Sequence, residues 1–168
     1  MKARTKGGKD AGWAAALALV AGLLFPVSTC AAEEGPLARG GTVSEFDAFG
    51  VDGGAKHVSY PKGSATVLLF FLSGCPTCHK MIPEWNRAYE RRPPKLNVIG
   101  ILMDQEPPGF FLATKIAFPV VRSPGRDFLE TWKVHRAPMT IRIGGGGTVE
   151  DVEVGIVDPI RLGEIFRP

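Results

Sequence analysis

The residues best suited to chemistry are two cysteines, Cys75 and Cys78, separated by Pro76 and Thr77. Cysteines three positions apart reach disulfide geometry when they lie on one helical turn, because residues i and i+3 are neighbours there. The loop that they close is so short that a disulfide would restrict the unfolded chain very little. The spacing therefore favours thiol–disulfide chemistry, and a purely structural disulfide is the simplest alternative.

The segments around the pair indicate how it is held. The run from Thr66 to Leu72 is apolar nearly throughout, which is typical of a central strand buried on both faces. A helix is expected from Cys75-Pro76 to about Arg91, with a kink at Pro83. Free N–H groups and the helix dipole stabilise a thiolate at the start of a helix. We therefore expect Cys75 to attack a partner disulfide and Cys78, one turn deeper, to resolve the mixed disulfide.

The rest of the chain alternates strands and helices, which predicts an α/β fold. Four glycines at 144–147 predict a hairpin turn, and Asp158 followed by Pro159 predicts the start of a last helix. The expected strands are Val43–Phe49, His57–Tyr60, Ala65–Leu72, Asn97–Met103, Phe118–Val121, Met139–Ile143 and Thr148–Val154. The other expected helices are Phe110–Ala117, Asp127–Lys133 and Pro159–Phe166.

Two segments resemble thioredoxin-like proteins. Phe70 to Pro83 resembles their active-site region, including the helix proline five residues after the second cysteine, and Val134 to Thr140 resembles their cis-proline segment. With Phe118 to Val121 and the glycine hairpin, the resemblance covers about residues 42–167 and is nearest to the secreted TlpA/ResA-type thiol–disulfide oxidoreductases. It implies a thioredoxin fold, in which a central mixed β-sheet is flanked by helices, with an N-terminal strand extension.

The resemblance also implies site roles and partners. Pro138 would lie beside the disulfide and shape the surface on which protein thiols and disulfides dock, together with Ala137, Gly74, Pro76 and Thr77. The redox group would be the Cys75–Cys78 disulfide itself, with no other cofactor. Apocytochrome c and a membrane thiol reductant are the partners that this branch suggests. The resemblance favours reduction of partner disulfides. Pro76, together with the absence of the buried acids that relatives carry, also suits an oxidant or isomerase.

Three positions depart from the family pattern. Gly74 stands where tryptophan usually precedes the first cysteine, and Leu69 and Met81 stand where relatives carry a buried acid. His79 lies four residues after Cys75 on the same side of the helix, which makes it a candidate acid/base. A solvated surface histidine is an equally good interpretation.

Two alternatives of other classes remain open. Cys75 to His79 also matches the CxxCH pattern of covalent c-type haem attachment, for which Met81, Met103 and Met139 have the right type for a second iron ligand. A redox-inactive interaction module on the same fold is the other alternative, because a fold alone does not establish function. His57, His79 and His135 are too scattered to predict a metal site.

The N-terminal 32 residues are typical of an export signal. A basic start with Lys2, Arg4, Lys6 and Lys9 precedes an apolar run from Trp13 to Phe25 and small residues from Ser28 to Ala32. A lipoprotein signal would place the lipid on Cys30, whereas ordinary cleavage would follow Ala31 or Ala32, and an uncleaved segment would act as an anchor.

The expected organisation is a signal at 1–32, a linker at 33–41 and a thioredoxin-like domain at 42–168, located outside the cytoplasm, as in a periplasm. The whole chain carries a formal charge of +3, and residues 1–30 account for it with four basic residues and Asp10. The mature protein is therefore near neutral, which disfavours nucleic acid as a partner.

Overall fold

The apolar run before the cysteines forms β3 (Thr66–Phe71), and all six of its residues are buried. The computed structural model describes residues 35–168. The expectations for the signal segment, for Cys30 and for the start of the linker lie outside the described residues. β3 pairs in parallel with β4 (Asn97–Leu102) and antiparallel with β6 (Met139–Ile143), so it occupies the central position predicted for it.

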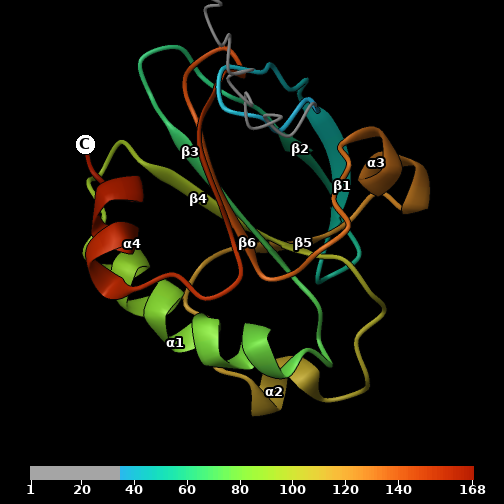
Figure 1. The fold of residues 1–168 in the computed structure, drawn as a ribbon. Coiled ribbons are helices and arrows are strands. Elements are labelled where there is room, and N and C mark those ends of the chain that lie inside the picture. Colours follow the sequence, from blue (N-terminus) through green and yellow to red (C-terminus); the bar gives the residue numbers. More distant parts are fainter. Residues whose placement is uncertain (1–34) are drawn as a thin grey trace, which may run out of the picture. The chain divides into compact units, whose positions relative to one another are not determined.

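β3 belongs to a seven-stranded mixed sheet with the order β2-β1-β5-β4-β3-β6-β7 (Figure 1). The β3–β4 and β4–β5 pairs are parallel and the other pairs are antiparallel. The remaining strands are β1 (Phe46–Gly50), β2 (Ala55–Val58), β5 (Val120–Arg122) and β7 (Val149–Val154). Since β3 and β4 end at the edge of the sheet where β6 begins, residues 72–75, 103–104 and 137–138 come together there.

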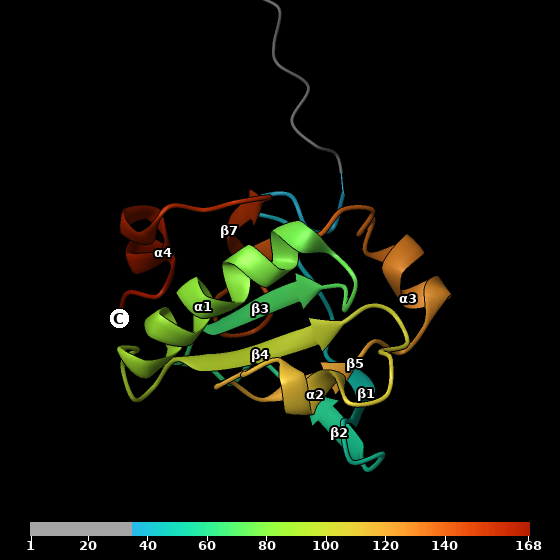
Figure 2. The same ribbon diagram turned by 90° about the horizontal axis from the view of Figure 1, so that it is seen from below.

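The helices cover the two faces of this sheet separately. They are α1 (Pro76–Glu90), α2 (Phe110–Ala113), α3 (Arg126–Thr131) and α4 (Pro159–Ile165). α1 lies over β3 and β4 with α4 beside it, and α3 lies on the other side of the sheet (Figure 2). Alternate β3 residues follow this division, because Leu69 packs with the α1 residue Trp85 whereas Phe70 packs with Trp132 at the end of α3.

The structure confirms the order of elements and shortens several of them. α2 ends at Ala113 rather than at Ala117, because Thr114 already has extended backbone angles. α3 ends at Thr131 rather than at the expected Lys133, because Lys133 takes a positive φ of 52°, which no helix continues. Asp158 caps α4 as predicted, accepting hydrogen bonds from the backbone N–H groups of Ile160 and Arg161.

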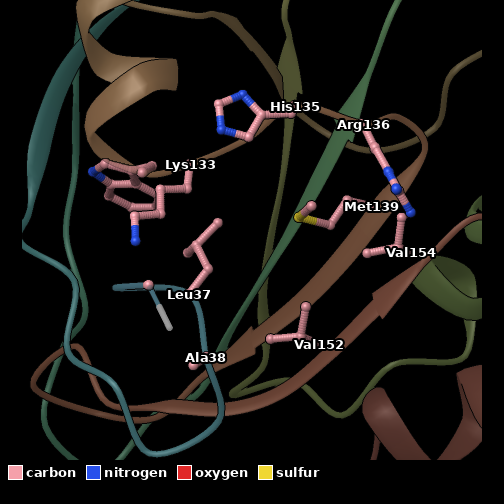
Figure 3. A pocket seen from close by; sticks show the side chains of 10 residues that line it. Leu37, Ala38, Lys133, His135, Arg136, Met139, Val152 and Val154 are labelled. Atoms are coloured by element: carbon pink, nitrogen blue, oxygen red, sulfur yellow. The ribbon is translucent and has the colours of Figure 1, made fainter. Parts of the chain in front are cut away.

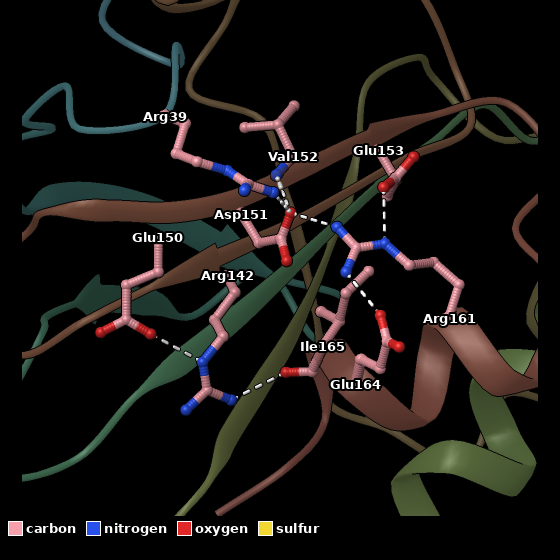
Figure 4. A network of polar contacts seen from close by, with 9 residues as sticks. All are labelled: Arg39, Arg142, Glu150, Asp151, Val152, Glu153, Arg161, Glu164 and Ile165. Carbon is pink, nitrogen blue, oxygen red and sulfur yellow. Dashed lines mark hydrogen bonds and ion pairs between the residues drawn. The ribbon is translucent and has the colours of Figure 1, made fainter.

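A polar network attaches the N-terminal part of the described chain to the domain (Figure 4). The Asp151 carboxylate on β7 is 6% exposed, and one of its oxygens accepts from Arg39 and from Arg161 at 2.5 Å each. Leu37 is buried in the core on the α3 face. The described part of the expected linker at 33–41 therefore packs against the domain.

Candidate active site

Cys75 is the N-cap residue of α1, one position before the helical turn in which it was expected. Its backbone is extended, with φ −86° and ψ 114°, and its Sγ accepts the backbone N–H of Cys78 at 3.2 Å. Both cysteines are free thiols in this structure. A sulfur in the place of a capping oxygen gains most from that N–H and from the helix dipole when it is negatively charged. The N-cap position thus gives the Cys75 sulfur a backbone hydrogen-bond donor at the start of α1.

Cys78 has the opposite surroundings. It is completely buried in the core between the sheet and α1. Burial is the main cause that raises its pKa to about 12, and the hydrogen bond to Cys75 and the charges of Cys75 and Asp104 raise it further, against a lowering backbone hydrogen bond at Leu72. Cys78 is therefore a protonated thiol at neutral pH and is hidden from a large partner.

The segment before β6 brings the second family motif to the pair. The Ala137–Pro138 peptide bond is cis, as the resemblance implies. The Cys75 thiol lies 3.9 Å from the Ala137 carbonyl oxygen, which can accept its S–H. Pro138 itself is buried and its carbonyl accepts the N–H of Gly155 at 2.8 Å, whereas Ala137 is half-buried. The surface beside Cys75 is thus formed by Ala137 more than by the proline ring.

The other predicted docking residues flank Cys75 along the chain. Gly74 and Pro76 are exposed, and Thr77 is half-buried. A Cβ atom added at Gly74 would meet no other atom within 4 Å, so the glycine in place of a tryptophan leaves open space beside Cys75.

His79 is exposed and points back toward the end of β3. Because a carbonyl oxygen only accepts, His79 donates from Nε2 to the Ser73 carbonyl oxygen, at 2.7 Å. Its ring also meets the edge of Phe110 with centroids 6.1 Å apart. These contacts occupy Nε2 and hold the ring against the loop before Cys75.

The positions of the usual buried acids are apolar here. Leu69 is fully buried and Met81 is 1% exposed, both in the core that also contains Cys78. The Met81 sulfur accepts the backbone N–H of Val157 at 3.4 Å. Met81 therefore fills its site and takes part in joining α1 to the segment before α4.

Sequence reasoning missed a carboxylate at this edge of the sheet. Asp104 follows β4 just as Ser73 follows β3, and the two side chains meet. The Ser73 backbone N–H donates to Asp104 Oδ1 and the Ser73 hydroxyl donates to Oδ2, each at 2.8 Å. The signal was present in the sequence, since the carboxyl ends of adjacent parallel strands meet where α/β proteins build their sites.

A pocket lies on the α3 side of the cis-proline loop (Figure 3). It has a volume of about 330 Å³. Its floor is apolar, its basic or potentially basic side chains are those of Lys133, His135 and Arg136, and no carboxylate is among the residues that line it. The lining consists of Gly35, Leu37, Ala38, Trp132, Lys133, His135, Arg136, Met139, Val152 and Val154. A partner that reaches Cys75 along residues 136–138 would meet this basic rim.

Within residues 35–168, no three His, Cys, Asp or Glu side chains gather as ligands for a metal ion. None of the helices described there has the length and apolar character needed to cross a membrane.

Comparisons with known proteins agree with this arrangement. A family model described as Redoxin matches residues 38–161. The sporulation thiol-disulfide oxidoreductase A of Bacillus subtilis (strain 168) is 25% identical over 115 residues, which cover 64% of this chain and 70% of the relative.

Solved structures repeat the fold. The crystal structure of StoA from Bacillus subtilis aligns with a TM-score of 0.63 and 21% identity, over 73% of this chain and 96% of that one. The pneumococcal exposed lipoprotein thioredoxin of Streptococcus pneumoniae strain TIGR4 aligns with a TM-score of 0.64 and 20% identity, over 73% and 98%.

Proposed function

Since the chain belongs to the redoxin family and is a thiol–disulfide oxidoreductase of the thioredoxin-like type, we propose that Cys75 and Cys78 are its redox centre and that Cys75 is the nucleophile. The observation that carries this proposal is the contrast between the two sulfurs. Cys75 is partly exposed and accepts a helix N–H, whereas Cys78 is buried and has a raised pKa. One thiol is therefore equipped to start the exchange and the other to finish it.

The first step joins the partner to the protein. The Cys75 thiolate attacks one sulfur of a partner disulfide, a mixed disulfide forms, and the second partner sulfur leaves as a thiolate that takes up a proton. The partner chain docks along Ala137 and over the open space at Gly74, with Pro76 and Thr77 on the other side of Cys75. Basic residues at the nearby pocket favour an acidic stretch next to the partner cysteine.

The second step releases the partner. Cys78 loses its proton and attacks Cys75, so that the Cys75–Cys78 disulfide forms as the bond to the partner breaks. The pair gives up two electrons and the partner leaves reduced. The disulfide itself is then the redox group, and no other cofactor takes part.

The direction that we propose is reduction of partner disulfides. It rests on the resemblance to the TlpA/ResA branch, which also suggests apocytochrome c as a partner and a membrane thiol protein as the source of electrons. The buried thiol of Cys78 and the capped sulfur of Cys75 serve either direction, so the reduction potential decides this point.

The location that we propose is outside the cytoplasm. The basic start, apolar run and small residues of the first 32 positions support export. The similarity to an exposed lipoprotein thioredoxin supports lipid attachment at Cys30. The mass of the mature chain distinguishes the two routes, because lipidation makes Cys30 the first residue whereas ordinary cleavage leaves Ala32 or Glu33 there.

Haem attachment fits this geometry poorly. Two thioether bonds and an iron ligand must face one cofactor, but Cys78 is fully buried in the core. The Nε2 atom of His79 is already bonded to the Ser73 carbonyl oxygen. Covalent haem would therefore require α1 to leave the sheet.

One experiment tests the exchange proposal. The purified mature protein is equilibrated with glutathione buffers of graded potential, and its free thiols and visible spectrum are recorded. We expect a reversible two-electron transition and no haem band. A pair that cannot be reduced reversibly would leave only a structural role, and a covalently retained haem would refute dithiol exchange.

Variants assign the roles of the two thiols. Cys78→Ser should accumulate mixed disulfides with partner proteins in cells, because the partner can no longer be released. Cys75→Ser should form none, since Cys78 is buried and protonated. The matched control is the double variant Cys75→Ser/Cys78→Ser, and trapping by Cys75→Ser alone would reverse the assignment.

A further inference from the structure

The exchange proposed above leaves the proton of Cys78 without an acceptor. A thiol that is protonated at neutral pH must lose its proton before it can attack. The positions 69 and 81, where relatives carry an acid, are filled here by buried apolar side chains. The acceptor must therefore come from another part of the structure.

We propose that Asp104, held in place by Ser73, accepts the proton of Cys78 when the mixed disulfide is resolved. The inference rests on the proposed function, because it concerns the second step of that exchange. Asp104 would be the general base, and Ser73 a positioning residue that acts through it.

The position of Asp104 supports this role. β3 and β4 are parallel neighbours, and the Met103 N–H donates to the Phe71 carbonyl oxygen at 2.9 Å just beyond the paired strands. Asp104 therefore lies next to Ser73. Ser73 in turn is two residues before Cys75, the proposed nucleophile. Its charge is one of the causes that raise the pKa of Cys78, so the carboxylate and the buried thiol act on each other.

The orientation of Asp104 is fixed at two points. The backbone N–H of Ser73 binds one carboxylate oxygen and its hydroxyl binds the other, and Ser73 is only 6% exposed. A general base must have a fixed orientation, and two hydrogen bonds from one residue fix a short carboxylate side chain. The same bonds join the loop before Cys75 to the end of β4.

Asp104 also provides a route for the proton to solvent. It is half-buried and lines a surface hollow of about 510 Å³ that reaches Arg122, Ser123 and Arg126. Cys78 is fully buried, whereas Asp104 lines the hollow.

The ionisable groups around this route are few. Cys75 lies on the α1 side, and His79 binds the carbonyl of the same serine that holds Asp104. On the solvent side Arg126 is exposed, and Arg122 is paired with Glu106. Both arginines line the same hollow as Asp104.

The step balances in protons and electrons. Cys78 gives its proton to the Asp104 carboxylate, and its thiolate attacks the Cys75 sulfur. The Cys75–Cys78 bond forms while the bond from Cys75 to the partner breaks. The partner sulfur leaves as a thiolate and takes a proton from water, and Asp104 returns its proton to solvent through the hollow.

The test separates the two steps with a chromogenic aromatic disulfide, dithiobis(nitrobenzoate), in a stopped-flow instrument. Attack by Cys75 releases one thionitrobenzoate, and resolution by Cys78 releases a second. We expect Asp104→Asn to leave the first phase unchanged and to slow the second by about 10- to 100-fold at neutral pH. Ser73→Ala, which keeps the charge and loses the hydroxyl bond, should slow the second phase less.

A pKa measurement makes the result decisive. In a Cys75→Ala background, ultraviolet titration of the Cys78 thiolate should show that Asp104→Asn lowers the pKa of Cys78, because a negative charge is lost. If Asp104 acted on Cys78 only through its negative charge, Asp104→Asn would make Cys78 more acidic and its attack faster. A slower second phase together with a lower pKa therefore identifies a base, and an unchanged or faster second phase would overturn the proposal.

Controls distinguish a loss of the base from unfolding and from a general effect of removing a charge. Asp127→Asn removes an exposed carboxylate on α3, on the other face of the sheet, and should change neither phase. Thermal unfolding checks that each variant is folded, and Ser73→Ala keeps the proposal testable should Asp104→Asn not fold. A wild-type protein without a first phase would refute the proposed function, whereas a normal first phase with an Asp104-independent second phase would refute only this inference.

Discussion

The indole Nε1 of Trp85 donates a hydrogen bond to Thr140 Oγ1 at 3.0 Å, and both side chains are completely buried. Trp85 lies on α1, the helix that begins at the cysteines, and Thr140 lies on β6, directly after the cis-proline segment. This bond is a buried polar link between α1 and the sheet, and it joins the two elements that carry the two halves of the proposed site.

Breaking this bond should lower the free energy of unfolding, and the effects of changing Trp85 and Thr140 should not be additive. Thr140→Val leaves the buried indole N–H without an acceptor and should lower the free energy of unfolding by about 1–3 kcal/mol. Trp85→Phe should cost more because it also leaves a cavity. The double variant should be more stable than the sum of the two losses predicts, by about 1 kcal/mol, in urea unfolding.

A control for this coupling exists on the other face of the sheet. Trp132 is also buried, but it packs in the α3-side core. Trp132→Phe and Thr140→Val should therefore be additive. Coupling of equal size in both pairs would show that the effect is general to the core.

The raised pKa of Cys78 makes the stability of the reduced protein depend on pH. An unfolded thiol ionises near 9.0, but the folded one keeps its proton to about 12. Between these values the unfolded chain has fewer protons than the folded protein, so the free energy of unfolding falls as pH rises. The full contribution is present below about pH 9.

Urea unfolding of the reduced protein at a series of alkaline pH values measures this slope. The difference between wild type and Cys78→Ala isolates the thiol, because the buried Tyr60, whose pKa is also raised, is common to both proteins. The slope of wild type should be the steeper of the two. Equal slopes would contradict the burial of a protonated Cys78 thiol.

Met81 should stabilise the fold through its sulfur contact as well as by filling space in the core. Met81→Leu keeps the side chain apolar and similar in size, but it leaves the Val157 N–H without the sulfur as an acceptor. We expect a loss of about 1–2 kcal/mol in the free energy of unfolding. Met103→Leu, at a half-buried site, is the matched control and should change stability less. Losses of equal size would mean that the sulfur contact contributes nothing.

Much of the fold could be predicted because its signals are local. The run of apolar residues in β3 specified a strand buried on both faces, and Asp158 with Pro159 specified the start of α4. The limits of α2 and α3 were less predictable, since they depend on single backbone angles at Thr114 and Lys133. Those angles follow from packing that no short segment encodes.

In the candidate site too, residues in local motifs could be predicted, whereas residues placed by tertiary structure could not. The sequence indicated Cys75, Cys78 and Pro138 because they lie in motifs with fixed spacing. Asp104 lies 31 residues from Ser73 and belongs to no motif, so the parallel register of β3 and β4 is what brings it to the loop before Cys75. The exact place of Cys75 as a helix cap also depended on backbone angles.

The basic rim beside the cis-proline loop predicts a preference among partners. Arg136 and His135 are exposed at the pocket next to Ala137, which meets Cys75. Two peptide disulfides that differ only in flanking charge, one with aspartates and one with lysines, should react at different rates. Wild type should reduce the acidic peptide about 3- to 10-fold faster at low salt, and added salt should reduce the difference.

Charge reversal gives the decisive comparison. Arg136→Glu should remove or invert the preference by slowing the acidic peptide and accelerating the basic one, while its rate with a small uncharged disulfide stays at the wild-type value. Arg91→Glu makes the same change in net charge at the far end of α1, where it should leave the preference intact. If Arg91→Glu has the same effect as Arg136→Glu, the preference comes from overall charge and the pocket rim has no special part in docking.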